Sequence, residues 1–410
     1  MPRFLHAITA SLTVSAALLP SVTCAQAPAA PTPTPTSLTT QAGPLRVERL
    51  AQLENPWGMA YLPDGRLLVT EKPGRLRIVA AGALTPTAVT GVPRVASRGQ
   101  GGLLDVAVDP AFATNGFVYL SYAELADSQP PAGARDPGDP RFGNFVDSTD
   151  AELKGGAVAR ARLDGTTLRD VKVIWRQLPK TIGRGHTGGR LVFGTDGTLF
   201  ITSGDRMRFD PAQDSSTNIG KVVRINTDGT IPANNPFTGR AGASADVFAM
   251  GSRNALGAAL HPTTGQLWIN EMGPAGGDEV NIIAAGRNYG WPRVSNGDNY
   301  DGSQLPDHVR DSSFAKPAMS WIPSISPSGM IFHTGKLFTQ WRGNVLLGGL
   351  SSMALFRLTL SGDKVTGSEM ITVGKRVRDV IEAPDGAVLI LTDGPTGELL
   401  RLTPAASRAP

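Results

Sequence analysis

The chain has 410 residues, with 39 Lys or Arg against 35 Asp or Glu, which gives a formal net charge of +4 at pH 7. This charge is small for the length and the basic residues are scattered, so nothing indicates a nucleic-acid-binding surface. Only 18% of the residues are charged, whereas there are 48 glycines and 32 prolines, a composition typical of a turn-rich β protein and not of a helical one.

Residues 1–25 have the features of a secretory signal peptide. Arg3 supplies a positive charge, residues 8–19 are apolar, and the residues before Gln26 fit a cleavage site. We therefore expect a periplasmic or secreted protein, with a lipoprotein anchor at Cys24 as the alternative. Because Cys24 is the only cysteine, the cleaved chain could not depend on disulfides for its stability.

The next segment, residues 26–42, is rich in Pro and Thr and is predicted to be an extended tether with little to bury. Residues 43–405 are predicted to form one domain. No stretch within them approaches the roughly 20 apolar residues that a membrane-spanning helix needs.

A turn of the type Pro-Asp-Gly or Thr-Asp-Gly, followed by an alternating strand, recurs along this domain. Copies begin at Leu62, Gly194 and Ala383, looser copies begin at Val108 and His261, and a further strand pair lies within residues 343–360. Asp-Gly turns between alternating segments favour hairpins, and their repetition every ~40–60 residues is typical of propeller blades. The spacing favours six blades, although counting alone leaves five or seven open. Two long polar segments, 124–152 and 294–318, are expected to rim the central channel.

His186 lies in Gly-Arg-Gly-His-Thr-Gly-Gly-Arg, residues 183–190, where four glycines leave room for a bulky group to approach the imidazole. Asp205 follows the next predicted strand. A His with a carboxylate within reach is the minimum equipment for general-base catalysis. The alternative is a turn histidine and an unrelated Asp.

Three further segments could carry chemistry. Arg253 is suited to stabilising a developing oxyanion, although a lone Arg is more often part of a salt bridge. Arg376 and Arg378 flank one residue and would share a strand face, which favours a phosphate or multi-carboxylate ligand between them; exposure on an outer blade face is the alternative. Residues 271–279 are acidic and Gly-rich, and could expose oxygen ligands for a hard cation such as calcium.

Other site types are not supported by the sequence. It has no Cys/His cluster with zinc spacing, no Walker loop and no Gly-x-Ser-x-Gly elbow. No Gly-x-Gly-x-x-Gly joins a strand to a helix, so a nicotinamide Rossmann site is unsupported.

Taken in order, these segments resemble the soluble quinoprotein sugar dehydrogenases that use pyrroloquinoline quinone (PQQ), over residues 45–403. The motifs that carry the resemblance are Asn55-Pro-Trp-Gly-Met-Ala, Gly99-Gln-Gly-Gly-Leu-Leu, His186 with Gly189-Arg190-Leu191, Gly204-Asp205, Gly220-Lys-Val-Val-Arg-Ile-Asn, Arg253-Asn254, Gly273-Pro274, Asp278-Glu279, Asn288-Tyr-Gly-Trp-Pro and Arg376-Val-Arg-Asp. The branch that acts on aldoses looks most similar. The resemblance implies an all-β, six-bladed β-propeller with its cofactor site at the mouth of the central channel.

The resemblance also implies roles for the candidate residues. His186 would be the base that takes the proton of the anomeric hydroxyl as hydride leaves C1 for the quinone C5. Asp205 would orient that imidazole, and Arg253 would stand beside the C5 oxygen. The expected cofactor contacts are Gln100, Arg253, Asn254, Trp321, Ser324, Arg376 and Arg378. The carbonyls of Gly273 and Pro274 would bind the calcium at the quinone, and Glu279 and Tyr289 a second, structural calcium.

Two departures from the glucose enzymes stand out. Gly185 replaces an Asp before the histidine, which predicts a broader aldose specificity. Gly349-Leu350-Ser351 stands where those enzymes carry a cofactor-binding Lys, which predicts weaker cofactor affinity unless a cation such as Lys375 substitutes.

The function implied is oxidation of aldoses to lactones, with electrons passed to an external acceptor. A calcium-dependent lactonase and a non-catalytic binding module are the alternatives.

Overall fold

The computed structural model of the chain describes residues 33–131, 134, 141 and 151–405. The expected signal peptide and most of the long 124–152 segment lie outside these residues. The described part is built almost wholly of strands, with short helical segments such as α1 (Phe112–Asn115), η2 (Asp210–Gln213) and η3 (Thr339–Trp341) between them. None of the helices in these ranges is long and apolar enough to cross a membrane.

The strands form six antiparallel sheets that follow one another along the chain. The first sheet contains β3 (Pro56–Tyr61), β4 (Leu67–Glu71), β5 (Arg75–Ala80) and β6 (Ala83–Leu84), and the second contains β7 (Leu103–Val108), β8 (Phe117–Leu125), β9 (Leu153–Asp164), β10 (Thr167–Arg176) and β11 (Thr181–Ile182). The third contains β12 (Gly188–Phe193), β13 (Thr198–Ser203), β14 (Lys221–Asn226) and β15 (Val247–Met250), and the fourth contains β16 (Ala255–Leu260), β17 (Leu267–Glu271), β18 (Asp278–Ile283) and β19 (Met319–Trp321).

The fifth sheet contains β20 (Pro327–Phe332), β21 (Val345–Gly349), β22 (Ala354–Ser361) and β23 (Lys364–Thr372). The sixth combines both ends of the folded chain: β24 (Val377–Glu382), β25 (Val388–Thr392) and β26 (Gly397–Pro404) are joined by β2 (Gly43–Leu53) and β1 (Ser37–Thr40). Pairing of β2 with β26 therefore closes the ring.

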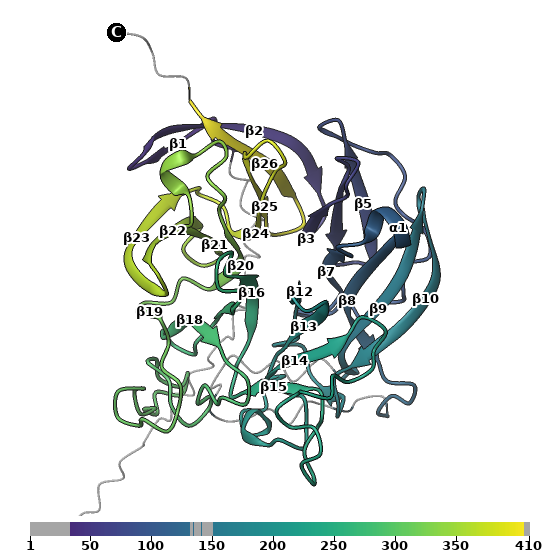
Figure 1. The fold of residues 1–410 in the computed structure, drawn as a ribbon, viewed down its shortest axis with the longest axis vertical. Helices are drawn as coiled ribbons and strands as arrows, with labels where there is room; N and C mark the ends of the chain where they lie inside the picture. The colour runs from purple at the N-terminus through teal and green to yellow at the C-terminus, as the bar shows by residue number, and fades with distance from the viewer. Residues whose placement is uncertain (1–32, 132–133, 135–140, 142–150, 406–410) are drawn as a thin grey trace, which may run out of the picture. The chain divides into compact units, whose positions relative to one another are not determined.

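The first strand of each sheet lies at the centre and contacts the first strand of the next, in the order β3, β7, β12, β16, β20, β24 and back to β3 (Figure 1). This arrangement confirms the six-bladed β-propeller. The recurring turns connect the first and second strands of their blades, for example at residues 62–66 between β3 and β4. Gly65 adopts φ +86° in that turn, a conformation that side-chain-bearing residues rarely adopt.

The folded body begins earlier than the sequence predicted, because β1 lies inside the segment assigned to the tether. Leu38 and Thr40 alternate inward along this strand and are buried, and Leu38 packs in the cluster that contains Trp341 and Leu400. The physical reason is that Pro35 is the last proline of the run, so the following main-chain N–H groups can pair with β2.

An ion triad occupies the inner strands at the channel axis. The Arg190 guanidinium on β12 contacts Asp105 on β7 at 3.0 Å and Asp379 on β24 at 3.1 Å, and all three side chains are buried. Arg190 also lies 4.6 Å from the ring centre of Trp57. The triad therefore ties three blades together beneath the ring of Trp57.

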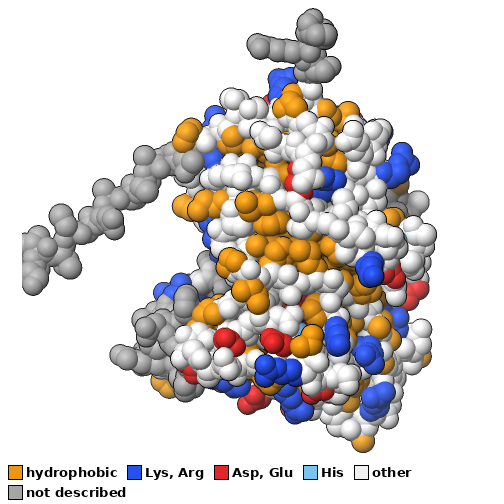
Figure 2. Space-filling view, turned by 90° about the vertical axis from the view of Figure 1, so that its left-hand side faces the viewer, with side chains coloured by type: hydrophobic (Ala, Val, Ile, Leu, Met, Phe, Trp, Pro, Cys, Tyr) orange, Lys and Arg blue, Asp and Glu red, His pale blue; other side chains and the backbone are white. Residues whose placement is uncertain are grey.

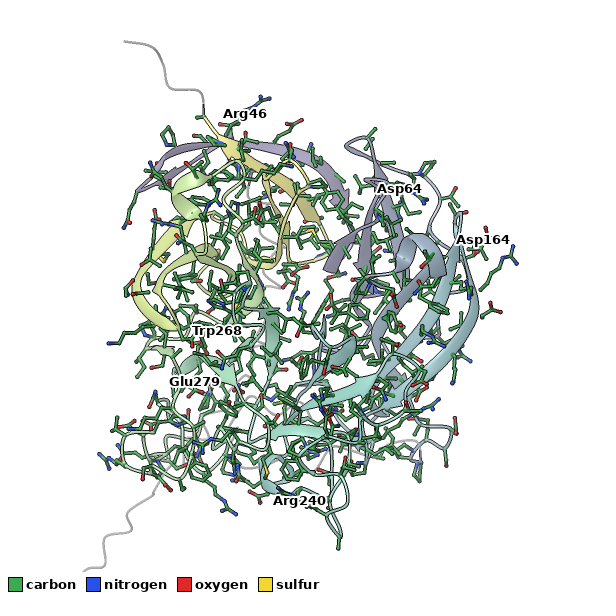
Figure 3. All side chains as sticks on the ribbon, in the orientation of Figure 1. Arg46, Asp64, Asp164, Arg240, Trp268 and Glu279 are labelled. Atoms are coloured by element: carbon green, nitrogen blue, oxygen red, sulfur yellow. The ribbon has the colours of Figure 1, made fainter. Side chains whose placement is uncertain are left out.

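Side chains fill the interior of the blades, where Trp268 is fully buried, whereas Asp164 and Arg240 lie at the periphery (Figure 3). On the side that bears β19 and β23, Lys and Arg side chains are interspersed with Asp and Glu (Figure 2).

Candidate functional site

The candidate residues gather at one end of the channel because of how each blade is threaded. In an antiparallel blade, the start of the first strand and the end of the second lie at the same edge. His186 and Arg253 precede the first strands β12 and β16, while Asp205 follows the second strand β13. The chain therefore brings these three side chains to one edge from neighbouring blades.

His186 and Asp205 form a buried pair. The His186 Nδ1 lies 2.6 Å from Asp205 Oδ1, and the two residues are 5% and 0% exposed. His186 has φ +49°, an uncommon conformation for a residue with a side chain, and its main-chain N–H donates to Gln100 Oε1 at 2.9 Å. A Cβ at Gly204 would lie 2.1 Å from the His186 carbonyl oxygen, so only glycine permits the two loops to approach this closely.

Asp205 is held as a carboxylate by several donors. Its Oδ1 accepts the Met207 main-chain N–H at 2.9 Å, and its Oδ2 accepts the Trp291 indole N–H at 2.7 Å. Burial opposes ionisation, but the charge and hydrogen bond of His186, the charge of Arg253 and the Met207 hydrogen bond hold the pKa of Asp205 below its usual value. Because an ionised carboxylate only accepts, the proton of a neutral His186 belongs on Nδ1.

Burial lowers the pKa of His186, and Arg253 lowers it further, against the opposing attraction of Asp205. The imidazole is therefore neutral near pH 7. Its Nε2 is the basic nitrogen, with Asp205 placed to stabilise the charge that appears when Nε2 takes a proton.

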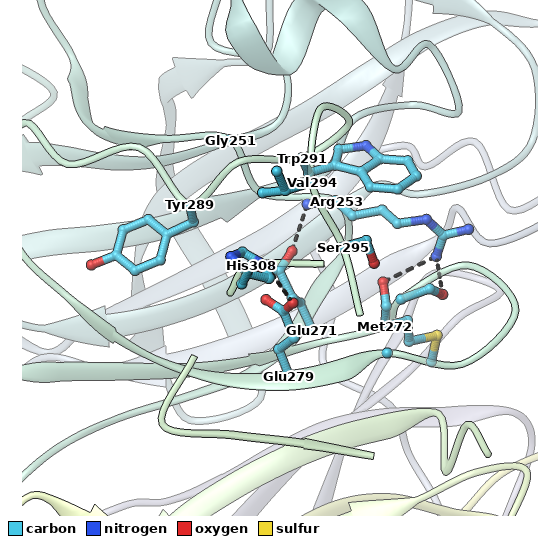
Figure 4. A pocket seen from close by; sticks show the side chains of 12 residues that line it. Gly251, Arg253, Glu271, Met272, Glu279, Tyr289, Trp291, Val294, Ser295 and His308 are labelled. Carbon is cyan, nitrogen blue, oxygen red and sulfur yellow. Dashed lines mark hydrogen bonds and ion pairs between the residues drawn. The ribbon is translucent and has the colours of Figure 1, made fainter. Parts of the chain in front are cut away.

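Arg253 is fixed from both its main chain and its guanidinium (Figure 4). The carbonyl of Arg253 accepts the Asp205 main-chain N–H at 2.8 Å, and Nη1 donates to the carbonyls of Met272 and Gly273 at 3.0 and 2.7 Å. The guanidinium lies 5.1 Å from the ring centre of Trp291. A permanent cation is therefore held close to the His186–Asp205 pair.

Asn254 is buried beside Arg253, and its Oδ1 accepts the Gly188 main-chain N–H at 3.3 Å. Among the residues that the structure describes, its Nδ2 has no hydrogen-bond partner. A buried donor without an acceptor costs about 1–3 kcal/mol. The site therefore presents a donor suited to an acceptor atom of a bound group.

A cavity of about 190 Å³ lies beside this group, and Gln100, Thr187 and Gly188 form part of its wall. Apolar side chains and cations line most of the remainder, among them Trp57, Leu256, Leu350, Lys72, Arg376 and Arg378. Such a wall suits a flat apolar ligand that carries negative groups along one edge.

Arg376 and Arg378 face this cavity and not the outer surface of a blade. Each donates its Nε–H to Asp393, at 3.0 Å, and burial of Asp393 is outweighed by the two guanidiniums, which lower its pKa. The anion between the paired cations is therefore a side chain of the protein itself. With Lys72 nearby, the wall still carries more positive than negative charge.

Two other expected cofactor contacts, Trp321 and Ser324, are not among the residues that line this cavity. Trp321 packs edge-on against Phe356, with ring centres 6.0 Å apart. Ser324 donates its hydroxyl to Asp278 Oδ2 at 2.7 Å. Ser326, two residues along the chain, lines the cavity instead.

Three of the four expected calcium ligands, Gly273, Glu279 and Tyr289, line a second cavity of about 10 Å³, a volume suited to a single ion or water. The Gly273 carbonyl accepts from Arg253, and the Pro274 carbonyl accepts the Gly276 N–H at 3.1 Å.

Glu271 and His308 also line this smaller cavity (Figure 4). His308 Nε2 contacts Glu279 Oε1 at 2.9 Å. The Tyr289 hydroxyl points away and donates to the Ile282 carbonyl at 2.5 Å, so a ligand from Tyr289 would be its main-chain oxygen. No three His, Cys, Asp or Glu side chains in the described ranges form a metal cluster, so main-chain oxygens must contribute to any such site.

Burial and the charge of Glu279 raise the pKa of Glu271 to about 7. Two buried carboxylates close enough to repel each other form a pair that a cation would neutralise. The donor set, carboxylate with main-chain oxygen, is the one that calcium prefers.

Comparison with known proteins identifies the family. The family model "Glucose / Sorbosone dehydrogenase" matches residues 53–401. The chain belongs to the glucose/sorbosone dehydrogenase family. Among its relatives, aldose sugar dehydrogenase YliI of Escherichia coli is 38% identical over 360 residues, which cover 86% of this chain and 91% of the relative.

Solved structures of family members have the same fold. The apo-form of the soluble aldose sugar dehydrogenase from Escherichia coli superposes with a TM-score of 0.79 at 37% identity, over 88% of this chain and 100% of that one. The PQQ-bound aldose sugar dehydrogenase from Streptomyces coelicolor gives a TM-score of 0.68 at 26% identity, over 90% and 99%.

Sequence reasoning missed several members of this glucose/sorbosone dehydrogenase site. Trp291, which donates to Asp205, stands in the quoted Asn288 motif, but the sequence gives it no role of its own. His308 gave no signal, because its contact with Glu279 depends on the folded 294–318 segment. Glu271 lay in the acidic segment 271–279, but its position opposite Glu279 depends on the pairing of β17 with β18. Lys72 follows β4 in an ordinary-looking turn, and nothing local shows that it lines the channel.

Proposed function

We propose that this protein oxidises aldoses at C1 to lactones with PQQ as cofactor and calcium as the metal ion. The observation that carries the proposal is the placement of the buried His186–Asp205 pair against the cation-lined cavity. The dehydrogenase names of its relatives support the same reaction class.

The residues at the cavity fit PQQ, a planar ring system with three carboxylates. Arg376 and Arg378 offer charge-assisted hydrogen bonds to carboxylates, and Trp57 offers an apolar surface to the rings. Asn254 offers the buried donor that has no acceptor in the described protein. Bound PQQ would supply the hydride acceptor.

His186 Nε2 removes the proton of the sugar's C1 hydroxyl while the C1 hydrogen departs as hydride. Asp205 holds the ring through Nδ1 and stabilises the imidazolium. A positioned base of this kind contributes roughly 10²–10⁴ to the rate. Arg253 supplies positive charge where the acceptor becomes negative. The second product is one proton, which His186 releases to solvent.

Calcium is proposed at two places. The main-chain oxygens of Gly273 and Pro274 would hold the ion beside the cofactor, where a cation polarises an oxygen as a Lewis acid. The Gly273 carbonyl also accepts from Arg253, so an ion there would share this oxygen with the guanidinium. Glu279 and the main chain of Tyr289 would hold a structural ion.

The remaining parts of the proposal follow from the sequence. The N-terminal segment supports export to the periplasm or the medium, where an external acceptor, a cytochrome or a quinone, would take the electrons. Gly185 supports a broad aldose range. Met207 packs against Gly185, since a Cβ there would lie 2.2 Å from its sulfur.

The test is dye reduction by the purified protein with a panel of aldoses, with and without PQQ and calcium. We expect activity with several aldoses only when both are present. Hydrolysis of a lactone with calcium alone would replace this proposal with the lactonase, and binding of neither PQQ nor sugar would leave only a binding module.

A further inference from the structure

We propose that Lys72 is a cofactor-binding residue: it supplies a third cation for the carboxylates of the bound quinone, in place of the lysine missing from Gly349-Leu350-Ser351. The inference rests on the proposed function and extends its binding site to a different blade.

The main chain fixes Lys72 at the cavity edge, directly after β4. Its N–H donates to the Asn55 carbonyl and its carbonyl accepts the Leu103 N–H, both at 3.0 Å. A Cβ at Gly102 would lie 2.3 Å from the Lys72 oxygen, so the adjoining chain is packed against it. The side chain lines the cavity shared with Arg376 and Arg378.

Lys72 is not neutralised by a carboxylate. Its Nζ donates to the Gly99 carbonyl at 2.9 Å, and none of the ion pairs among the described residues includes it. Lys375, the substitute suggested by the sequence, instead pairs with Glu398 at 2.6 Å and does not line the cavity. Lys72 is therefore the better placed of the two to bind an anion.

The charges around Lys72 favour an anionic ligand. Burial lowers the pKa of Lys72, and Arg378, Arg184 and Lys154 lower it further, while Asp393 acts in the opposite direction. An excess of positive charge in a partly buried site is relieved when an anion binds. Three lining cations against one Asp leave room for a polyanion such as a tricarboxylate.

Lys72 also connects the cofactor cavity to the base. The Gly99 carbonyl that it contacts precedes Gln100, whose Oε1 accepts the His186 N–H. An anion at Lys72 would therefore sit next to the loop that positions His186.

The test is equilibrium binding of PQQ to the full-length apo-protein, followed by quenching of tryptophan fluorescence, since Trp57 lines the cavity. We expect K72Q to raise Kd at least about tenfold, the loss of one charge-assisted hydrogen bond. K72R should keep Kd within about threefold, and the control K375Q should bind as the wild type does.

A second ligand separates charge from structure. The trimethyl ester of PQQ keeps the ring system but has no carboxylate charge, so K72Q and wild type should bind it equally. Equal loss of PQQ and ester affinity in K72Q, or an unchanged Kd for PQQ, would overturn the role of Lys72. Failure of the wild type to bind PQQ at all would instead refute the proposed function.

Discussion

The environment of His186 determines the pH at which it can accept a proton. Burial holds its pKa below the ordinary histidine value, so the neutral base persists at pH values where an exposed histidine is protonated. The rate should therefore fall only when the pH drops through this lowered pKa. A profile of kcat against pH for the PQQ-loaded protein checks this, and an acid limb above about pH 7 would contradict it.

Trp291 is a positioning residue, because it acts on His186 through Asp205. W291F removes the donor to Asp205 Oδ2 and leaves that carboxylate oxygen unsatisfied. We expect kcat to fall about tenfold, from a loss of about 1–2 kcal/mol. The acid limb should also move upward, since a less compensated Asp205 attracts the imidazolium more strongly.

The matched control for Trp291 is W268F. Trp268 is buried, but its indole N–H has no hydrogen-bond partner in the described part of the chain. The control should leave the pH profile unchanged. If both variants change the profile alike, the effect is one of packing and not of the bond to Asp205.

At the scale of strands, β1 is part of the propeller. L38A should lower the free energy of unfolding by about 2 kcal/mol, because Leu38 is buried in the cluster between the fifth and sixth blades. Urea denaturation measures this effect. The control is L178A, because Leu178 is 56% exposed. If L38A and L178A lower the free energy of unfolding by the same small amount, β1 belongs to the tether and not to the propeller.

Strand β18 and the segment after it carry the second calcium prediction, at Glu279 and Tyr289. Calcium should stabilise the metal-free protein by about 3 kcal/mol at a hundredfold excess over its Kd. E279Q should abolish the part of this response that the structural ion supplies and leave at most the part from the ion at Gly273 and Pro274. A calcium response unchanged by E279Q would place the structural ion elsewhere.

Strands and turns could be predicted from the sequence where the pattern that marks them is local. Asp-Gly turns such as the one at Asp64 and Gly65 mark the connection between the first and second strands of a blade. The number of blades was not fixed by this pattern, because closure depends on β2 pairing with β26 at the other end of the chain.

The residues of the candidate site were likewise predictable only where a local sequence pattern marks them. His186 and Arg253 were recognisable from their glycine-rich or motif context. The partner of Arg376 and Arg378 was not, because Asp393 reaches them from the end of the paired strand β25. Lys72 was equally hidden, since only the ring closure places the first blade beside the sixth, through β3 and β24.

The whole ring is needed to assemble the site. Lys72 comes from the first blade, Asp205 from the third, Leu350 from the fifth and Arg378 from the sixth. The triad centred on Arg190 joins the inner strands of three blades beneath this group. A change that prevents the propeller ring from closing is therefore expected to disrupt the site as well.

The most direct measurement is oxidation of an aldose deuterated at C1 by the PQQ- and calcium-loaded protein, compared with H186N loaded to the same extent. The account predicts a lactone without deuterium, a primary isotope effect, and a loss of at least about a hundredfold in H186N. Equal turnover by H186N, or no oxidation by a fully loaded wild type, would contradict it.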